Sequence, residues 1–132
     1  LESRQLYEES FEDSKEFVNY YYAHMTKHNH ILTLKVKEEI ASMLHIVPKQ
    51  FHHQKEADYY YAIATAKKHR KKGYMERLLK KAMKFSYRNQ RGLVYLVPAI
   101  NDLYESICST KIRILFFSFS FLYYIFVGER LI

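Results

Sequence analysis

The chain has 132 residues, enough for one domain or a few units of a helical array, and it can bury most of its apolar surface. Three Gly and two Pro are too few for the turns of a β-sandwich or barrel, which favours long helices. A single cysteine, Cys108, excludes an internal disulfide and favours a reducing compartment. Because the chain begins with Leu1 and shows no secretory leader, we expect a piece of a larger intracellular protein, cytoplasmic or nuclear.

The formal net charge of +7 is unevenly distributed. Between Lys67 and Arg91, eleven Lys or Arg residues face one acidic residue, Glu76, which gives a local net charge of +10. Residues 1–16 carry a net charge of −4. The acidic N-terminal segment and the basic central segment could attract each other when the chain's own helices pack, or could bind a partner.

Apolar residues at helical spacing predict the first two elements. A helix over residues 6–28, with Ser10 and Ser14 as caps, has a potential break near Asp13. After a polar turn, a second helix runs from Leu32 to a stop before Pro48. The β-branched run from Ile31 to Val36 also resembles a strand, but no partner strand of matching pattern follows it.

Three more elements complete the prediction. A third helix covers residues 54–69, and Gly73 in a left-handed conformation closes it. A fourth covers residues 74–89, with the apolar side Met75, Leu78, Leu79, Ala82 and Met83 opposite a basic side. Gly92 closes this helix, and a fifth element extends over residues 93–109.

An internal sequence repeat favours a helical array. The segment Asn19–Ala23 with Thr26 matches Asp58–Ala62 with Thr65, at an offset of 39 residues, although coincidence also explains two copies in a tyrosine-rich chain. The alternation of large and small apolar residues over 59–83 resembles a tetratricopeptide repeat; it involves Tyr59, Ala62, Ile63, Ala66, Met75, Leu79, Ala82 and Met83. Ile63 replaces the usual small residue, the turn is longer, and no proline closes the unit. The resemblance implies a scaffold that binds other proteins along a concave face.

The sequence therefore predicts an all-α fold, an array of antiparallel helix hairpins with about five helices over residues 1–110. An apolar C-terminal segment, residues 111–132, follows it. From Ile114 to Val127 only two serines interrupt the apolar run, which falls short of the roughly 20 residues of a membrane-spanning helix. A packed final helix, a tail anchor through residues 112–128 and an aberrant ending remain open.

No catalytic motif is recognisable. The sequence contains no glycine-framed serine, no glycine-rich phosphate loop and no nucleotide fingerprint. Histidines cluster, with His24 and His28 four residues apart, but they lack the thiolates or the HExxH pattern of a zinc site. We therefore predict that the chain is not an enzyme and has no metal site, no cofactor and no small-molecule substrate.

The run Lys67–Lys72 is the sharpest local signal. With the exposed side of the fourth helix it predicts a basic binding patch: Lys67, Lys68, Arg70, Lys71, Lys72, Arg77, Lys80, Lys81, Lys84 and Arg88. Nucleic acid, a nuclear-import receptor or anionic lipid would each gain from this charge, and a solvated helix end is the plainer alternative.

Two tyrosine triplets are candidate interface residues: Tyr20, Tyr21, Tyr22, Tyr59, Tyr60 and Tyr61. Three consecutive rings spread around more than half of a helix, so at least one ring of each triplet should lie at a rim or an interface. The leading hypothesis is a non-catalytic helical scaffold with a protein partner. The alternatives are a nucleic-acid-binding or nuclear module acting through residues 67–91 and a tail-anchored membrane protein.

Overall fold

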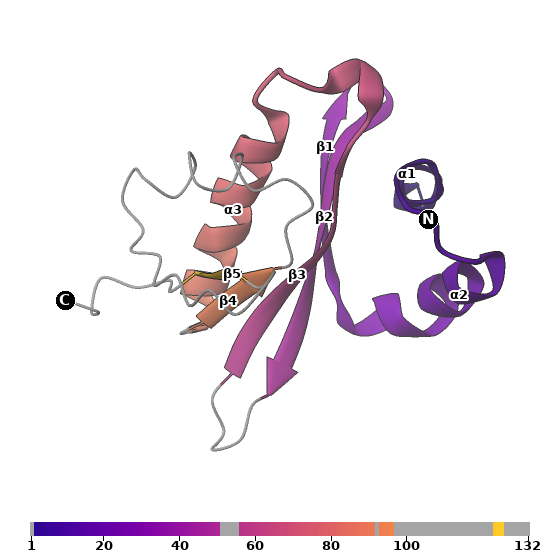
Figure 1. Cartoon of the computed structure of the whole chain (residues 1–132). Helices are drawn as coiled ribbons and strands as arrows, with labels where there is room; N and C mark the ends of the chain where they lie inside the picture. The colour runs from indigo at the N-terminus through magenta and orange to yellow at the C-terminus, as the bar shows by residue number, and fades with distance from the viewer. Residues whose placement is uncertain (1, 51–55, 92, 97–122, 126–132) are drawn as a thin grey trace.

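Three layers make up the fold, with a β-sheet between helices (Figure 1). The computed structural model describes residues 2–50, 56–91, 93–96 and 123–125. Its five strands are ordered β1-β2-β3-β4-β5. Helices α1 and α2 lie on one face of the sheet and α3 on the other. The all-α prediction is therefore wrong: the fold is mixed α/β.

The N-terminal region is helical, as predicted, and is interrupted near Asp13. Helix α1 (Ser3–Ser10) and helix α2 (Lys15–Tyr20) are followed by a π-helical turn (Tyr21–Met25) and a 3-10 turn (Thr26–His28). Ser14 caps α2, because its side chain accepts a hydrogen bond from the Phe17 N–H at 3.2 Å. This cap confirms the predicted role of Ser14 and fixes the break between the helices.

The predicted second and third helices are strands. Strands β1 (His30–Val36), β2 (Glu39–Gln50) and β3 (Glu56–Thr65) form an antiparallel meander, β4 (Leu93–Leu96) lies parallel to β3, and β5 (Tyr123–Ile125) lies antiparallel to β4. The strand alternative for Ile31–Val36 was therefore the correct one, and its partner is β2.

Two features made β2 and β3 resemble helices. Residues 41–46 of the interior strand β2 are all buried, so burial does not alternate along this part of the strand. Strand β3 has a bulge where its register against β2 shifts between Met43 and His45, and Ala62 there has φ +51°. Consequently Tyr61 and Ala62 both face α1, so the regular alternation of side chains between the two faces of the sheet is interrupted there.

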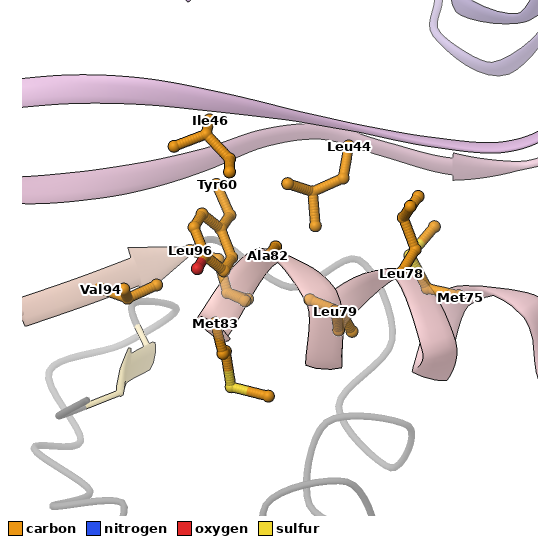
Figure 2. Close-up of a cluster of buried hydrophobic side chains, with 10 residues drawn as sticks. All are labelled: Leu44, Ile46, Tyr60, Met75, Leu78, Leu79, Ala82, Met83, Val94 and Leu96. Atoms are coloured by element: carbon orange, nitrogen blue, oxygen red, sulfur yellow. The ribbon is translucent and has the colours of Figure 1, made fainter. Parts of the chain in front are cut away.

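Helix α3 (Tyr74–Arg88) confirms the fourth predicted helix, including its buried side. Leu79, Ala82 and their neighbours pack on the sheet through a core shown in Figure 2: Leu44, Ile46, Tyr60, Met75, Leu78, Leu79, Ala82, Met83, Val94 and Leu96. The prediction that Gly73 ends a preceding helix is wrong. Gly73 instead stands at the start of α3, with φ +76°. Glycine adopts this left-handed conformation without steric cost.

The helix-hairpin repeat is absent from the described residues. The first tyrosine triplet lies at the end of α2 and in the π-helical turn, whereas the second lies in β3. Of the predicted fifth helix, Leu93–Leu96 is a strand; the rest, with Cys108, lies outside the described residues.

Only Tyr123–Ile125 of the C-terminal segment is described, and it is a strand rather than a helix. The remainder of residues 111–132 lies outside the described part of the chain. None of the helices that the structure describes is long and apolar enough to span a bilayer.

Candidate functional site

A basic loop connects β3 to α3 and is fixed to the end of the sheet. The Ala66 N–H donates to the Ala41 carbonyl at 2.8 Å, and the His69 N–H donates to the Ala66 carbonyl at 2.9 Å. The Arg70 Nε donates to the Thr65 carbonyl at 3.1 Å. These bonds hold the loop close to the carboxyl end of β3, the end at which open α/β sheets bind ligands.

The N-terminus of α3 is open and lined by amides. Lys71 and Gly73 both have positive φ, +60° and +76°. The first intrahelical hydrogen bond runs from the Arg77 N–H to the Gly73 carbonyl at 3.2 Å, so the N–H groups of residues 74–76 have no partner within the helix. A Cβ on Gly73 would meet no heavy atom within 4 Å. The arrangement suits a phosphate, which gains from the free N–H groups and from the helix dipole.

All ten residues of the predicted basic patch are exposed. Five of them, Lys67, Lys68, Arg70, Lys71 and Lys72, lie in the loop before α3, and the other five lie along the outer side of the helix. Lys68 pairs with Glu39, and Lys80 pairs with Glu76 at 2.9 Å. The loop residues therefore surround the amide-lined N-terminus with positive charge, whereas the helix residues continue away from it.

Strand β3 extends beyond its pairing with β4. The last pair in the parallel ladder is Tyr60 with Leu96. Residues 61–65 continue the strand and pair with β2, and among the described residues they have no β4 partner on the other edge. An extended ligand with amide groups could pair with this edge as an added strand would.

An aromatic cluster lies on the face of the sheet opposite α3. Tyr7 and Tyr21 are buried and stacked, with ring centroids 5.6 Å apart. The Tyr21 hydroxyl lies 2.5 Å from Nδ1 of His45, which is 0% exposed. The edge of the Tyr61 ring packs against Tyr21 at 5.5 Å. These contacts attach α1 and the π-helical turn to β2 and β3.

One carboxylate reaches this cluster from the connection between α1 and α2. The Tyr7 hydroxyl donates to Asp13 Oδ2 at 2.6 Å, and the Tyr7 and Tyr61 hydroxyl oxygens are 2.6 Å apart. Burial raises the pKa of Tyr7 and of Tyr61 above the ordinary value of 10. Both hydroxyls therefore stay protonated at neutral pH, and the Asp13 carboxylate is the acceptor at the end of this series of hydrogen bonds.

Acidification from pH 7 to pH 5 should destabilise the fold by about 2 kcal/mol through His45. Burial lowers the pKa of His45 from 6.5 to about 4. Between these values the unfolded chain binds a proton that the folded chain does not, so this stability is complete above pH 6.5 and is lost as the pH falls towards 4. Urea unfolding at both pH values measures the loss.

The His45→Asn variant is the control for this pH effect. Its Oδ1 can accept the Tyr21 hydroxyl, but the side chain does not titrate in this range. Other groups titrate equally in both proteins. The variant should therefore lose about 2 kcal/mol less than the wild type between the two pH values. An equal loss would contradict the role assigned to His45.

A buried polar network joins the end of α3 to β3. The Ser86 hydroxyl donates to Asp58 Oδ2 at 2.6 Å and lies 2.8 Å from the Tyr60 hydroxyl. Arg91 Nε lies 3.3 Å from Asp58 Oδ1, and Arg91 also pairs with Glu56. Asp58 is 1% exposed, so it is a buried charge compensated by two partners.

An acidic groove of ≈ 360 Å³ lies between α1 and the β1-β2 turn. Its lining includes Glu2, Glu9, Glu38 and Glu39, with Lys68 at one side. These carboxylates disfavour phosphate, in contrast to the basic loop before α3. No three His, Cys, Asp or Glu side chains gather as metal ligands in the described part of the chain.

The predicted interface tyrosines have different environments. Tyr20 is 58% exposed, whereas Tyr21 and Tyr60 are each 1% exposed. Tyr22, Tyr59 and Tyr61 are half-buried. Each triplet therefore contributes one ring to a core. In β3 the cause is the strand's alternation between two faces rather than helical geometry.

The sheet order and the two helical layers define a mixed α/β domain with a basic, phosphate-compatible loop at the carboxyl end of β3. The chain belongs to the acetyltransferase (GNAT) domain family, whose sequence profile matches residues 2–107. No curated protein is significantly similar to the chain in sequence.

Solved structures share this fold. A conserved protein of Enterococcus faecalis V583 has a TM-score of 0.70 at 18% identity; the match covers 80% of this chain and only 28% of that one. A GNAT-family protein of Desulfovibrio desulfuricans has a TM-score of 0.67 at 15% identity, over 95% and 90% of the two chains. An aminoglycoside 6'-N-acetyltransferase complexed with coenzyme A has a TM-score of 0.60 at 12% identity, over 73% and 53%.

Family membership corrects several predictions. The tetratricopeptide resemblance and the non-catalytic scaffold are wrong, because the matching family consists of acetyltransferase domains. The prediction that the chain is not an enzyme is overturned by the same match. The match also overturns the alternatives of a nucleic-acid-binding or nuclear module and of a tail-anchored membrane protein. The expectation of a protein partner without a small-molecule substrate is wrong as well, since acetyltransferases act on acetyl-CoA and an acceptor.

The sequence contained one usable signal for the loop. Arg70-Lys71-Lys72-Gly73 directly precedes the strongest amphipathic helix, and a glycine at a helix start is consistent with a phosphate site. Because a single glycine does not match the glycine-rich loop patterns, it was interpreted as the end of a preceding helix. The sequence predicts Asp13 only as a helix break and gives no role to Tyr7, since no pattern connects either residue to Tyr61.

Proposed function

We propose that this chain binds acetyl-CoA and transfers its acetyl group to an amine. The amide-lined, positively surrounded N-terminus of α3 is the observation that carries the proposal, together with family membership. A thioester supplies an activated acyl group, so the protein has to hold the donor, admit an amine and accept the proton that the amine loses.

The loop before α3 fits the phosphates of coenzyme A. Residues 74–76 offer N–H donors, and Gly73 leaves the space before them open. Lys71 and Lys72 are exposed beside it and have no acidic partner among the described residues. Phosphate oxygens would therefore gain both hydrogen bonds and charge neutralisation.

The edge of β3 over residues 61–65, which has no β4 partner among the described residues, fits the pantetheine arm. This arm carries two amides and is about as long as four residues of extended chain, ~13 Å. The same length of β3, residues 61–65, leads from the loop back to the bulge at Ala62. A donor held by its phosphates at α3 would therefore bring its thioester close to Tyr61.

The Lys71→Gln/Lys72→Gln double variant should bind acetyl-CoA about tenfold more weakly than the wild type, a loss of ~1.4 kcal/mol. Both ammonium groups flank the phosphate site, whereas Gln removes the charge and keeps a polar, slightly shorter side chain. Isothermal titration calorimetry with acetyl-CoA measures the affinity. The decrease should shrink as the salt concentration rises, because screening weakens the lost interaction.

The matched control is Lys81→Gln/Lys84→Gln, which removes two positive charges from the outer side of α3. It should change the affinity less than about threefold, since these residues lie beyond the first turn of the helix. Equal losses in the two double variants would indicate general charge attraction. Wild-type protein that does not bind acetyl-CoA would refute the proposed function.

A further inference from the structure

Three side chains from separate elements form a continuous hydrogen-bonded chain. Tyr61 of β3, Tyr7 of α1 and Asp13 of the α1-α2 connection are linked by two short contacts of 2.6 Å. Tyr7 is 0% exposed, whereas Asp13 lies at the surface. This series of hydrogen bonds therefore runs from Tyr61 on the sheet, through the buried Tyr7 hydroxyl, to Asp13 at the surface.

The hydrogen bonds of this chain have one direction. A carboxylate can only accept, so Tyr7 gives its single hydroxyl hydrogen to Asp13. Since that hydrogen is already used, the contact between the two tyrosines requires Tyr61 to donate to the Tyr7 oxygen. Both hydrogens point towards Asp13, and the Tyr61 oxygen keeps lone pairs that can accept an N–H from outside the chain.

Tyr61 stands beside the position expected for the thioester. It precedes Ala62, the left-handed residue of the bulge, and it is the first residue of β3 beyond the pairing with β4. Its ring lies on the face opposite α3, where Tyr59 packs 5.8 Å away. An amine approaching on this face would meet the Tyr61 hydroxyl before the Tyr7 hydroxyl or the Asp13 carboxylate.

We infer that Tyr61, Tyr7 and Asp13 form a proton relay that removes the proton of the acceptor amine during acetyl transfer. The inference rests on the proposed function. As the C–N bond forms and the C–S bond breaks, the amine proton passes to the Tyr61 oxygen, the Tyr61 proton to Tyr7, and the Tyr7 proton to the Asp13 carboxylate. Asp13 releases it to water, and the sulfur leaves with its electron pair and takes a proton from solvent.

The roles within the relay differ. Tyr61 is the catalytic residue, because it touches the amine. Tyr7 and Asp13 act through it. Neither tyrosine has to ionise, because each hydroxyl gives up one hydrogen as it receives another. The amine N–H becomes acidic as its lone pair forms the C–N bond, and this change drives the proton along the relay. Burial of Tyr7 keeps competing water away from the middle of the relay.

The test uses Tyr61→Phe, Asp13→Asn and, as a matched control, Tyr22→Phe. Asn can still accept from Tyr7 but cannot take up the proton. Tyr22 belongs to the same aromatic cluster, and its hydroxyl contacts Ser3 at 3.3 Å rather than the relay. The assay is the release of free thiol from acetyl-CoA with tyramine or with water as acceptor, accompanied by calorimetric acetyl-CoA affinities and melting temperatures.

Tyr61→Phe and Asp13→Asn should each lower kcat at least about tenfold, at unchanged acetyl-CoA affinity and tyramine KM. Tyr22→Phe should retain the wild-type kcat. The rate plotted against the D2O fraction should be curved for the wild type, since several protons move together, and linear for Tyr61→Phe.

Two results would overturn the relay. One is a kcat for Tyr61→Phe and Asp13→Asn equal to that of Tyr22→Phe. The other is wild-type protein that binds acetyl-CoA but releases thiol with neither tyramine nor water. A failure to bind acetyl-CoA at all would instead count against the proposed function, so the two failures are distinguishable.

Discussion

Gly73→Asn should weaken acetyl-CoA binding about a hundredfold, ~2.7 kcal/mol, while the free energy of unfolding changes little. The substitution places a side chain in the space before the α3 N-terminus, where no heavy atom lies within 4 Å of a Cβ. A phosphate displaced from there loses charge-assisted hydrogen bonds worth about 1.5–3 kcal/mol each. Calorimetric titration and urea unfolding measure the two quantities separately.

Gly73→Ala is the companion variant that separates backbone strain from blocked space. Ala is disfavoured at φ +76°, by about 1–2 kcal/mol, whereas Asn tolerates this conformation. Both side chains place a Cβ in the same space before the helix. The two variants should therefore lose similar affinity but differ in stability. If affinity followed stability instead, distortion of the loop rather than a blocked phosphate would explain the loss.

Asp58→Ala should lower the free energy of unfolding by about 3 kcal/mol. The variant leaves the Ser86 hydroxyl without its acceptor and deprives Arg91 of a buried counter-charge. Breaking a buried ion pair costs about 3–5 kcal/mol, and the remaining pair of Arg91 with Glu56 reduces this amount. Urea unfolding at pH 7 gives the value.

Glu76→Gln is the matched control for Asp58→Ala. It breaks an exposed ion pair, with Lys80, on the surface of α3. Such a pair contributes about 0.3–0.5 kcal/mol. A decrease for Asp58→Ala no larger than this would indicate that the network does not hold α3 to β3. A further Arg91→Met substitution should recover part of the loss, because the partly buried guanidinium would then no longer lack its Asp58 counter-charge.

The amphipathic pattern predicted α3 and its buried side correctly, because a helix packed on one sheet face displays its environment as a regular period. The same rule failed for β2. This interior strand is buried on both faces along residues 41–46, so burial does not alternate there, and Ala41, Met43 and Leu44 are residue types common in helices. The tertiary environment of β2 therefore determines that it is a strand, whereas the local residue preferences favour a helix.

The candidate site was less predictable than the fold. The basic loop was conspicuous, yet its chemistry depends on Gly73 beginning a helix rather than ending one. Tyr7 and Tyr61 are 54 residues apart, and only the packing of α1 on β3 brings their hydroxyls together. The parallel pairing of β3 with β4 likewise joins segments separated by a helix, which no local pattern reveals.

The bulge at Ala62 accommodates one extra residue without changing the sides of the residues that follow it in β3. Tyr61 and Ala62 both face α1, so Ile63 and Ala64 lie on the sides that they would have if Ala62 were absent. A deletion of Ala62 would therefore remove the local bend beside Tyr61 and leave the later side chains on their present faces. A one-residue change elsewhere in β3, with no bulge to absorb it, would instead move every later side chain to the opposite face.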